Sequence, residues 1–240
     1  IKSFSPNLGN CQSLCLSSDG TKAFAADYSS AVVYQYSLST AYDISTASQT
    51  ATFNTSTQTG FCEGAFFSRD GTIMYATGGG GCWQYSLSTP WSISTASYAN
   101  KSVSYSGTNA GCISYNGSNF YLTTAGGVCA WYKLSTPFDI STASQQNTIT
   151  LDTNNFQISS VDVNGNYIVG SQGIQNGGLV KLYNLSTPFN TSTASLSQSY
   201  NPSSASGNTS YTGWAFFDNT GTRMYVAFAY NQPQFTEFSH

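Results

Sequence analysis

The sequence predicts an all-β protein: a five-bladed β-propeller, in which five four-stranded antiparallel sheets, the blades, stand in a ring. An eleven-residue phrase occurs four times, beginning at Leu38, Leu87, Leu134 and Leu185, and reads Leu-Ser-Thr-Pro-Phe-Asp-Ile-Ser-Thr-Ala-Ser in its third copy. Repetition with a period of roughly fifty residues is typical of propellers and solenoids. A tight turn followed by an aromatic residue recurs five times, at Asp19-Gly20, Asp70-Gly71, Asn116-Gly117, Asn164-Gly165 and Thr220-Gly221. Asp-Gly and Asn-Gly between apolar runs indicate a β-hairpin.

Four strands are expected around each turn, because aromatic and β-branched residues flank it in short runs. The first strand precedes the turn (65–67, 215–217), the second follows it (73–76, 223–227), the third leads into the phrase (31–36, 82–85, 130–132, 179–183) and the fourth follows the phrase (103–105, 149–151). The one helical turn expected lies at Ser-Thr-Pro of the phrase, where Ser or Thr can cap and Pro can start a helix. We expect the phrase aromatics to pack against the blade, with a binding role as the alternative; they are Tyr42, Trp91, Phe138 and Phe189.

The two ends of the chain predict how the ring closes. Blade five has a third strand at 234–238 but no fourth, whereas residues 2–4 form a spare strand before blade one. Placing residues 2–4 as the outer strand of blade five would remove an exposed sheet edge. We therefore expect one domain over 1–240, with blades at about 6–54, 55–105, 106–151, 152–200 and 201–240 plus 1–5.

Composition limits the partners. Charged residues make up 7% of the chain, and the net charge is −3, against roughly 25% charged residues in an ordinary soluble domain. The seven basic residues are scattered, so we expect no nucleic-acid partner. No apolar run approaches the length of a membrane span, so membrane insertion is not expected. The chain begins at Ile1, which suggests removal of a signal peptide or trimming.

The cysteines and the Asn-x-Ser/Thr sequences point to an extracellular location. The six cysteines are Cys11, Cys15, Cys62, Cys82, Cys112 and Cys129, and the chain's single histidine is His240. Disulfides are favoured over zinc, with Cys62–Cys82, Cys112–Cys129 and Cys11–Cys15 as the expected pairs, the last requiring a turn before the first strand. The candidate glycosylation sites are Asn54, Asn100, Asn116, Asn184, Asn190 and Asn208, although a chain rich in Asn, Ser and Thr produces such sequences by chance.

The combination of turn and phrase resembles a repeat of phage tail and receptor-binding proteins and of large secreted prokaryotic proteins. The match is clearest at Asp70-Gly-Thr-Ile-Met-Tyr75 with 85–96, and at 132–143; blades four and five depart from it. This resemblance implies a propeller with an extracellular or virion role and carries no catalytic residues. Blade number and repeat length are also similar to those of tachylectin-type lectins, a likeness of architecture only.

Catalytic sets are not evident. A Ser-His-Asp or Cys-His arrangement needs an internal histidine, and the acidic residues outside the repeats, such as Asp27 and Glu63, occupy unlike positions in their blades. We therefore expect no enzyme activity, no catalytic residue, no metal and no cofactor. The loops between second and third strands offer neutral hydrogen-bonding groups for a ligand such as a sugar, with plain hairpin turns as the alternative; these residues are Gln172, Gln175, Asn176, Tyr230, Asn231 and Gln232.

Two functions remain open at this point. The first is a secreted or virion-surface propeller with a structural and interaction role, which can assemble with copies of itself because a weakly charged surface repels little. The alternative is a carbohydrate-binding lectin that uses the loops named above.

Overall fold

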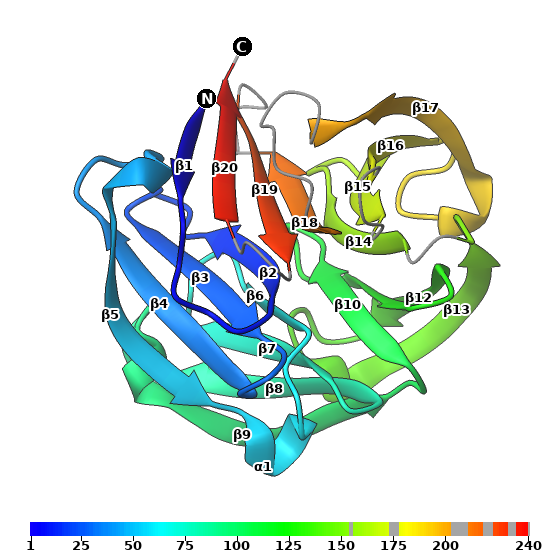
Figure 1. The fold of residues 1–240 in the computed structure, drawn as a ribbon. Coiled ribbons are helices and arrows are strands. Elements are labelled where there is room, and N and C mark those ends of the chain that lie inside the picture. Colours follow the sequence, from blue (N-terminus) through cyan, green and yellow to red (C-terminus); the bar gives the residue numbers. More distant parts are fainter. Residues whose placement is uncertain (154–155, 173–177, 203–210, 218–222, 230–233, 240) are drawn as a thin grey trace.

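The computed structural model is a ring of five blades, as the sequence predicts, and describes residues 1–153, 156–172, 178–202, 211–217, 223–229 and 234–239 (Figure 1). Blade one consists of β2 (Cys11–Leu16), β3 (Lys22–Asp27), β4 (Val32–Leu38) and β5 (Ala47–Asn54). Blade two consists of β6 (Gly64–Phe67), β7 (Ile73–Gly78), β8 (Gly81–Leu87) and β9 (Ala96–Ser104). Blade three consists of β10 (Thr108–Ile113), β11 (Asn119–Thr124), β12 (Val128–Leu134) and β13 (Ala143–Thr150). Blade four consists of β14 (Phe156–Val161), β15 (Tyr167–Gln172), β16 (Val180–Leu185) and β17 (Ala194–Tyr200). Blade five consists of β18 (Tyr211–Phe217), β19 (Arg223–Ala229), β20 (Gln234–Ser239) and β1 (Lys2–Phe4).

The N-terminal strand closes the ring, which confirms the prediction. β1 pairs antiparallel with β20, with Lys2 opposite Glu237 and Phe4 opposite Phe235. The ring of Phe4 also lies 5.4 Å from that of Tyr36 in blade one, so this strand joins the last blade to the first. The two termini accordingly lie side by side in Figure 1.

Each blade begins with an inner strand near the ring axis and ends with an outer strand at the rim; the inner strands are β2, β6, β10, β14 and β18. All inner strands run in the same direction. They end at the tight turns, and we call this side of the ring the turn end. The opposite side, where the second and third strands are connected, is the loop end.

The hydrophobic core lies between the blades. Among the described residues it divides into five clusters, each of which joins neighbouring blades, and the one between blades five and one also includes Ala110 of blade three. Phe24 of blade one packs with Met74 and Tyr85 of blade two, for example, and Phe66 of blade two packs with Phe120 of blade three. Burial between blades explains why one repeat could not fold without its neighbours.

The turn and the phrase are parts of one structural unit. In blade two the glycine of the turn, Gly71, has φ +71° and lies under the ring of Trp91, so close that a Cβ would approach the ring atoms to 2.4 Å. Trp91 itself has φ +59°, and its N–H donates to Gly71 O at 2.9 Å. Tyr42, Phe138 and Phe189 repeat this arrangement on Gly20, Gly117 and Gly165. The phrase aromatics therefore pack against their own blades.

The polar residues of the phrase stabilise its loop. In blade three, Asp139 Oδ1 accepts hydrogen bonds from the N–H and the hydroxyl of Ser141, while Thr142 Oγ1 donates to Asp139 O at 2.8 Å. A short 3-10 helix follows the cap, and the fourth strand begins immediately after it; these helices are η1 (Ile44–Thr46), η2 (Ile93–Thr95), η3 (Ile140–Thr142) and η4 (Thr191–Thr193). The helical turn was expected at Ser-Thr-Pro and this position is wrong, because Asp, with its side chain free to accept from the residue two places on, is the better cap.

The sequence missed one helix and placed the outer strands too late. α1 (Ser56–Thr59) lies between blades one and two and is only one turn long, with no hydrophobic period to predict it. The outer strands begin within the last two residues of the phrase, Ala and Ser, instead of several residues after it.

Candidate functional site

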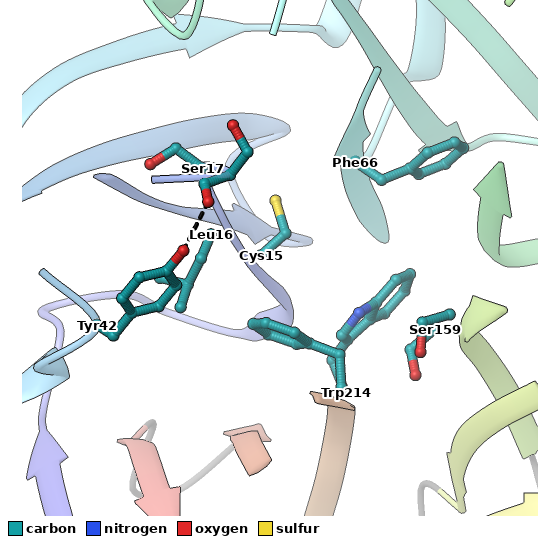
Figure 2. A pocket seen from close by; sticks show the side chains of 10 residues that line it. Cys15, Leu16, Ser17, Tyr42, Phe66, Ser159 and Trp214 are labelled. Atoms are coloured by element: carbon teal, nitrogen blue, oxygen red, sulfur yellow. Dashed lines mark hydrogen bonds between the residues drawn. The ribbon is translucent and has the colours of Figure 1, made fainter. Parts of the chain in front are cut away.

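The large cavity of the molecule lies on the ring axis at the turn end. It has a volume of about 930 Å³ and is lined from four blades by the last residues of the inner strands and the first residues of the turns, including Leu16, Phe66, Cys112 and Ser160. A smaller cavity of about 150 Å³ adjoins it. Figure 2 shows Cys15, Phe66, Ser159 and Trp214, which come from four inner strands, around the smaller cavity.

The loops predicted to bind a ligand lie at the opposite, loop end of the ring. Gln172 is the last residue of β15 and is 3% exposed, and its N–H donates to Leu179 O. The backbone of Gln172 therefore takes part in the hydrogen bonding between β15 and the residues that lead into β16. Gln175, Asn176, Tyr230, Asn231 and Gln232 lie outside the described residues, so binding at these loops stays a prediction.

The loop end also carries a carboxyl group that the sequence reading dismissed. Counting back seven residues from the first residue of the turn in blades one to four gives Gln12, Glu63, Asn109 and Gln157. The inner strands of four blades thus place amides at this position in three cases and a carboxyl in one. In blades one and three this residue is the extra residue of a β-bulge, a device that redirects side chains and is frequent beside active sites.

Glu63 lies against blade three. Its N–H donates to Thr77 O at 2.8 Å, and this bond fixes the backbone immediately before β6. With its amide turned so that nitrogen faces the carboxyl, Asn109 donates to Glu63 Oε2 at 3.2 Å and to Gly107 O at 3.0 Å. The carboxyl thus spans the junction between two blades and keeps one oxygen for a further partner.

Burial changes the acidity of Glu63. The loss of water around its partly buried carboxyl raises the pKa from the ordinary 4.5 to about 7, and the hydrogen bond donated by the turned Asn109 amide acts against this rise. Burial, the charge of Glu63 and the charge of Asp27 together raise the pKa of the neighbouring Cys62 thiol to about 12. At neutral pH this site therefore contains a carboxyl that exchanges a proton readily, and a thiol that keeps its proton.

Asp27, another acidic residue at this end, has a different role. It is 2% exposed and its Oδ1 accepts hydrogen bonds from Asn10 N at 2.9 Å and Ser29 N at 3.2 Å, while Oδ2 accepts from the Ser30 hydroxyl at 2.9 Å. Both oxygens are occupied in holding loop backbone and side chains. Asp27 is therefore a structural carboxylate, whereas Glu63 accepts a hydrogen bond at only one of its oxygens.

The six cysteines are free thiols in the structure, so the predicted disulfides are not formed in it. Cys11 and Cys15 stand on the same extended strand, β2, and four extended residues hold their Cα atoms too far apart for a bridge. Cys112 and Cys129 do share one buried cluster, and the pKa of Cys82 is raised by burial first and by the nearby Cys62 second, so these two pairs are neighbours. The cysteines give no support to an oxidising compartment, and the extracellular location stays a prediction.

The structure places the candidate glycosylation sites without deciding their occupancy. Asn54, Asn100, Asn116 and Asn184 are exposed. Asn190 is partly buried, because its oxygen caps η4 by accepting from Ser192 N at 3.1 Å. Asn208 lies outside the described residues.

The part of the chain that the structure describes has neither a metal-binding cluster nor a membrane-spanning helix. No three His, Cys, Asp or Glu side chains gather there in a group that could hold a metal ion. None of the described helices is long and apolar enough to cross a membrane.

The sequence matches no family model and no curated protein. Solved structures with a similar fold include two proteins described as "putative 6-phosphogluconolactonase". The one from Bacteroides uniformis is 16% identical with TM-score 0.54, and the one from Bacteroides fragilis is 12% identical with TM-score 0.53. Each alignment covers 89% of this chain, which spans only 62% of either protein. A functionally unknown protein from Desulfotomaculum acetoxidans is similar over the whole chain and 85% of its own, at 9% identity and TM-score 0.56.

At these identities the likeness shows the fold, but the names correct two of our predictions. We expected a non-catalytic structural propeller, with a lectin as the alternative, and no enzyme activity; similar propellers that are named as lactonases contradict this expectation. The error was to require an internal histidine. A carboxyl whose pKa is near 7 can take its place as a base, and the alignment of Glu63 with Gln12 and Asn109 could have been found by counting from the turns.

Proposed function

We propose that this chain is a hydrolase that opens a small sugar lactone, with Glu63 as the general base. The observation that carries the proposal is a single carboxyl immediately before β6 at the loop end, which contacts Asn109 of blade three and whose pKa burial raises to about 7. An efficient base has a pKa near the working pH, because it must be ionised and still hold a proton well. The names of the two Bacteroides propellers support a lactone as the substrate.

The reaction needs one base and one water molecule. Glu63 removes a proton from water while the oxygen attacks the lactone carbonyl carbon and forms a tetrahedral intermediate. The ring C–O bond then breaks, and the protonated Glu63 returns its proton to the leaving alkoxide. Asn109 donates to Glu63 Oε2 and so leaves Oε1 to face water. In this scheme Asn109 is a positioning residue.

The surroundings of Glu63 favour an uncharged substrate. Its described neighbours include the amide of Asn109, the carbonyl of Thr77 and the thiol of Cys62. None of these is a cation that would recognise a phosphate. We therefore expect glucono-δ-lactone to be a better substrate than 6-phosphogluconolactone, although the latter is the substrate in the names of the similar structures.

The test is lactone hydrolysis followed at pH 5 to 9 by acid release, against the spontaneous rate. The proposal expects kcat/KM to rise through an apparent pKa of about 7, and Glu63→Gln to lower it by about 100-fold or more, the usual contribution of a general base. Asp43→Asn, which removes a surface ion pair with Lys2, is the matched control and should keep the activity. Hydrolysis no faster than in buffer, or full activity in Glu63→Gln, would overturn the proposal.

The repeat itself supports a second, narrower proposal. Turn and phrase form one packed unit in this chain. We expect this if the two are inherited together, as they are in the repeats of the phage and secreted proteins that the sequence resembles. An experimental structure of one such repeat protein should contain the same aromatic at positive φ over the glycine of its turn. A different contact there would contradict the kinship.

A further inference from the structure

Blade four differs from the other blades in the face that it turns toward its neighbour. At three other joints the tyrosine of the second strand, Tyr75, Tyr121 or Tyr225, donates to the carbonyl of the next blade's phrase aromatic at 2.7–2.9 Å. Strand register places Val169 at the same position in blade four. Valine has no hydroxyl to hold a neighbouring loop.

In the third strand of blade four, too, an apolar residue stands where a hydrogen-bonding residue stands in blades one and two. Gln35 Oε1 accepts from Ile93 N at 3.0 Å, and Gln84 Oε1 accepts from Ile140 N at 3.1 Å, so each glutamine holds the 3-10 helix of the following blade. Register places Leu182 at this position in blade four. Blade five carries no copy of the phrase. Blade one has Phe24 at the first of these positions and blade three has Trp131 at the second, but each keeps a polar partner, Gln35 or Tyr121, at the other. Blade four alone has aliphatic residues at both positions and so presents an apolar surface.

The large cavity extends onto this surface. Val161, Val169 and Leu182 belong to its lining, together with Phe66 and Trp91 from across the ring axis. Its volume of about 930 Å³ lies within the usual range of about 300–1,000 Å³ for small-molecule sites. The cavity therefore offers a continuous apolar wall to a ligand.

The mouth of the cavity carries a positive charge. The guanidinium carbon of Arg69 lies 3.7 Å from the centre of the Tyr115 ring, and both residues line the cavity. No salt bridge involves Arg69 in the part of the chain that the structure describes. The one acidic side chain among the lining residues that the structure describes, Asp162, has both oxygens occupied by the N–H groups of Asn164 and Tyr167.

Large apolar side chains are also exposed around this mouth. Tyr115 is 40% exposed, Tyr167 43% and Val163 55%, and all three line the cavity. These are three of only seven large hydrophobic residues that are exposed in the described chain. Their concentration at one opening marks a surface that contacts an organic ligand.

We propose that this cavity binds an amphipathic organic anion, with a medium-length alkyl chain against Val161, Val169 and Leu182 and a carboxylate beside Arg69. The site is at the turn end, whereas Glu63 is at the loop end, so binding here is independent of the proposed hydrolysis. Arg69 attracts the acid group, and the apolar wall left by the missing phrase contacts the chain.

The experiment measures the binding of decanoate and of decanol, below their aggregation limits, by calorimetry and by the fluorescence of Trp91 and Trp214, which line the cavities. Decanoate should bind at least ten times more tightly than decanol. Arg69→Gln should weaken decanoate about tenfold and leave decanol unchanged. Leu182→Gln, which installs the residue that blades one and two have at this position, should weaken both ligands about tenfold.

Two controls keep the outcome clear. Lys133→Gln removes an exposed lysine that does not line the cavity, and Glu63→Gln changes the opposite end of the ring. Both variants should bind decanoate and decanol as the unchanged protein does. Absence of decanoate binding to the unchanged protein would overturn the proposal. Equal binding of decanoate and decanol would overturn the role of Arg69, and binding unaffected by Leu182→Gln would overturn the role of blade four.

Discussion

Replacing Glu63 by glutamine should make the protein more stable at high pH than at low pH, relative to the unchanged protein. The folded state raises the pKa of Glu63 from 4.5 to about 7 by burying the carboxyl. Between these two pH values the folded chain binds more protons than the unfolded chain, so the free energy of unfolding falls as pH rises. The favourable contribution is complete below pH 4.5 and is lost as pH passes through 7. Glutamine does not titrate and removes this dependence.

The size of the effect follows from the shift. A difference of roughly 2.5 pKa units corresponds to about 3 kcal/mol at most, and partial solvent screening of Glu63 reduces this to about 1–3 kcal/mol. In a chain of this length 1 kcal/mol changes the melting temperature by roughly 2–4 °C. Glu63→Gln should therefore melt several degrees above the unchanged protein at pH 8.5 and close to it at pH 4.

Thermal unfolding followed by circular dichroism at pH 4, 6, 7 and 8.5 measures this difference. Asp43→Asn provides a control of opposite sign, because the hydrogen bond from Lys2 and that from Ser45 lower the pKa of Asp43. A carboxyl with a lowered pKa stabilises the fold at high pH and loses that contribution as pH falls. Parallel curves for Glu63→Gln and the unchanged protein would refute the raised pKa and remove the main support for Glu63 as a base.

Four other predictions test the architecture. Deleting residues 1–5 should lower the melting temperature by several degrees, because it exposes the edge of β20 and opens the ring; an unchanged melt would contradict the closure. Tyr75→Phe should cost about 1 kcal/mol, since it deletes the hydroxyl that donates to Phe138 O, and urea unfolding measures this. Gly117→Ala should cost about 2 kcal/mol or more, because φ is +71° and the Phe138 ring fills the space; wild-type stability would contradict the packing. Thiol titration of the denatured, unreduced protein should count six thiols, and fewer would reveal disulfides.

The repeated residues made most of the fold predictable. Five turns and four phrases give the number of blades, and the spare N-terminal strand gives the closure. What the sequence could not give was the connection between the two signals. The contact between Gly71 and Trp91 depends on two residues at positive φ that are twenty positions apart, and neither composition nor periodicity contains this information. The helix α1 was missed for the same reason, since one turn of Ser-Thr-Gln-Thr has no apolar period.

The candidate site was less predictable, because single residues determine it. Glu63 was noticed as an acid outside the repeats, but its burial and its contact with Asn109 come from two blades that meet only in the ring. The prediction from the cysteines was limited for a similar reason, because it too depends on where single residues lie in the fold. Their even number suggested disulfides, whereas Cys11 and Cys15 are side chains of one extended strand and four buried thiols serve as small apolar groups in the core.

Function in this protein should be sought where the blades differ, because the repeated residues are already engaged in holding the ring. The phrase aromatics contact the turns, the phrase carbonyls accept hydrogen bonds from neighbouring tyrosines, and the capping aspartates hold their loops and, at Asp139, the lysine of the adjacent blade. None of these groups is left to bind a substrate. Two departures from the repeat remain: a carboxyl among amides at Glu63, and an apolar face at Val169 and Leu182, where each other blade keeps at least one hydrogen-bonding side chain. They lie at opposite ends of the same ring, so each can be altered while the other is measured.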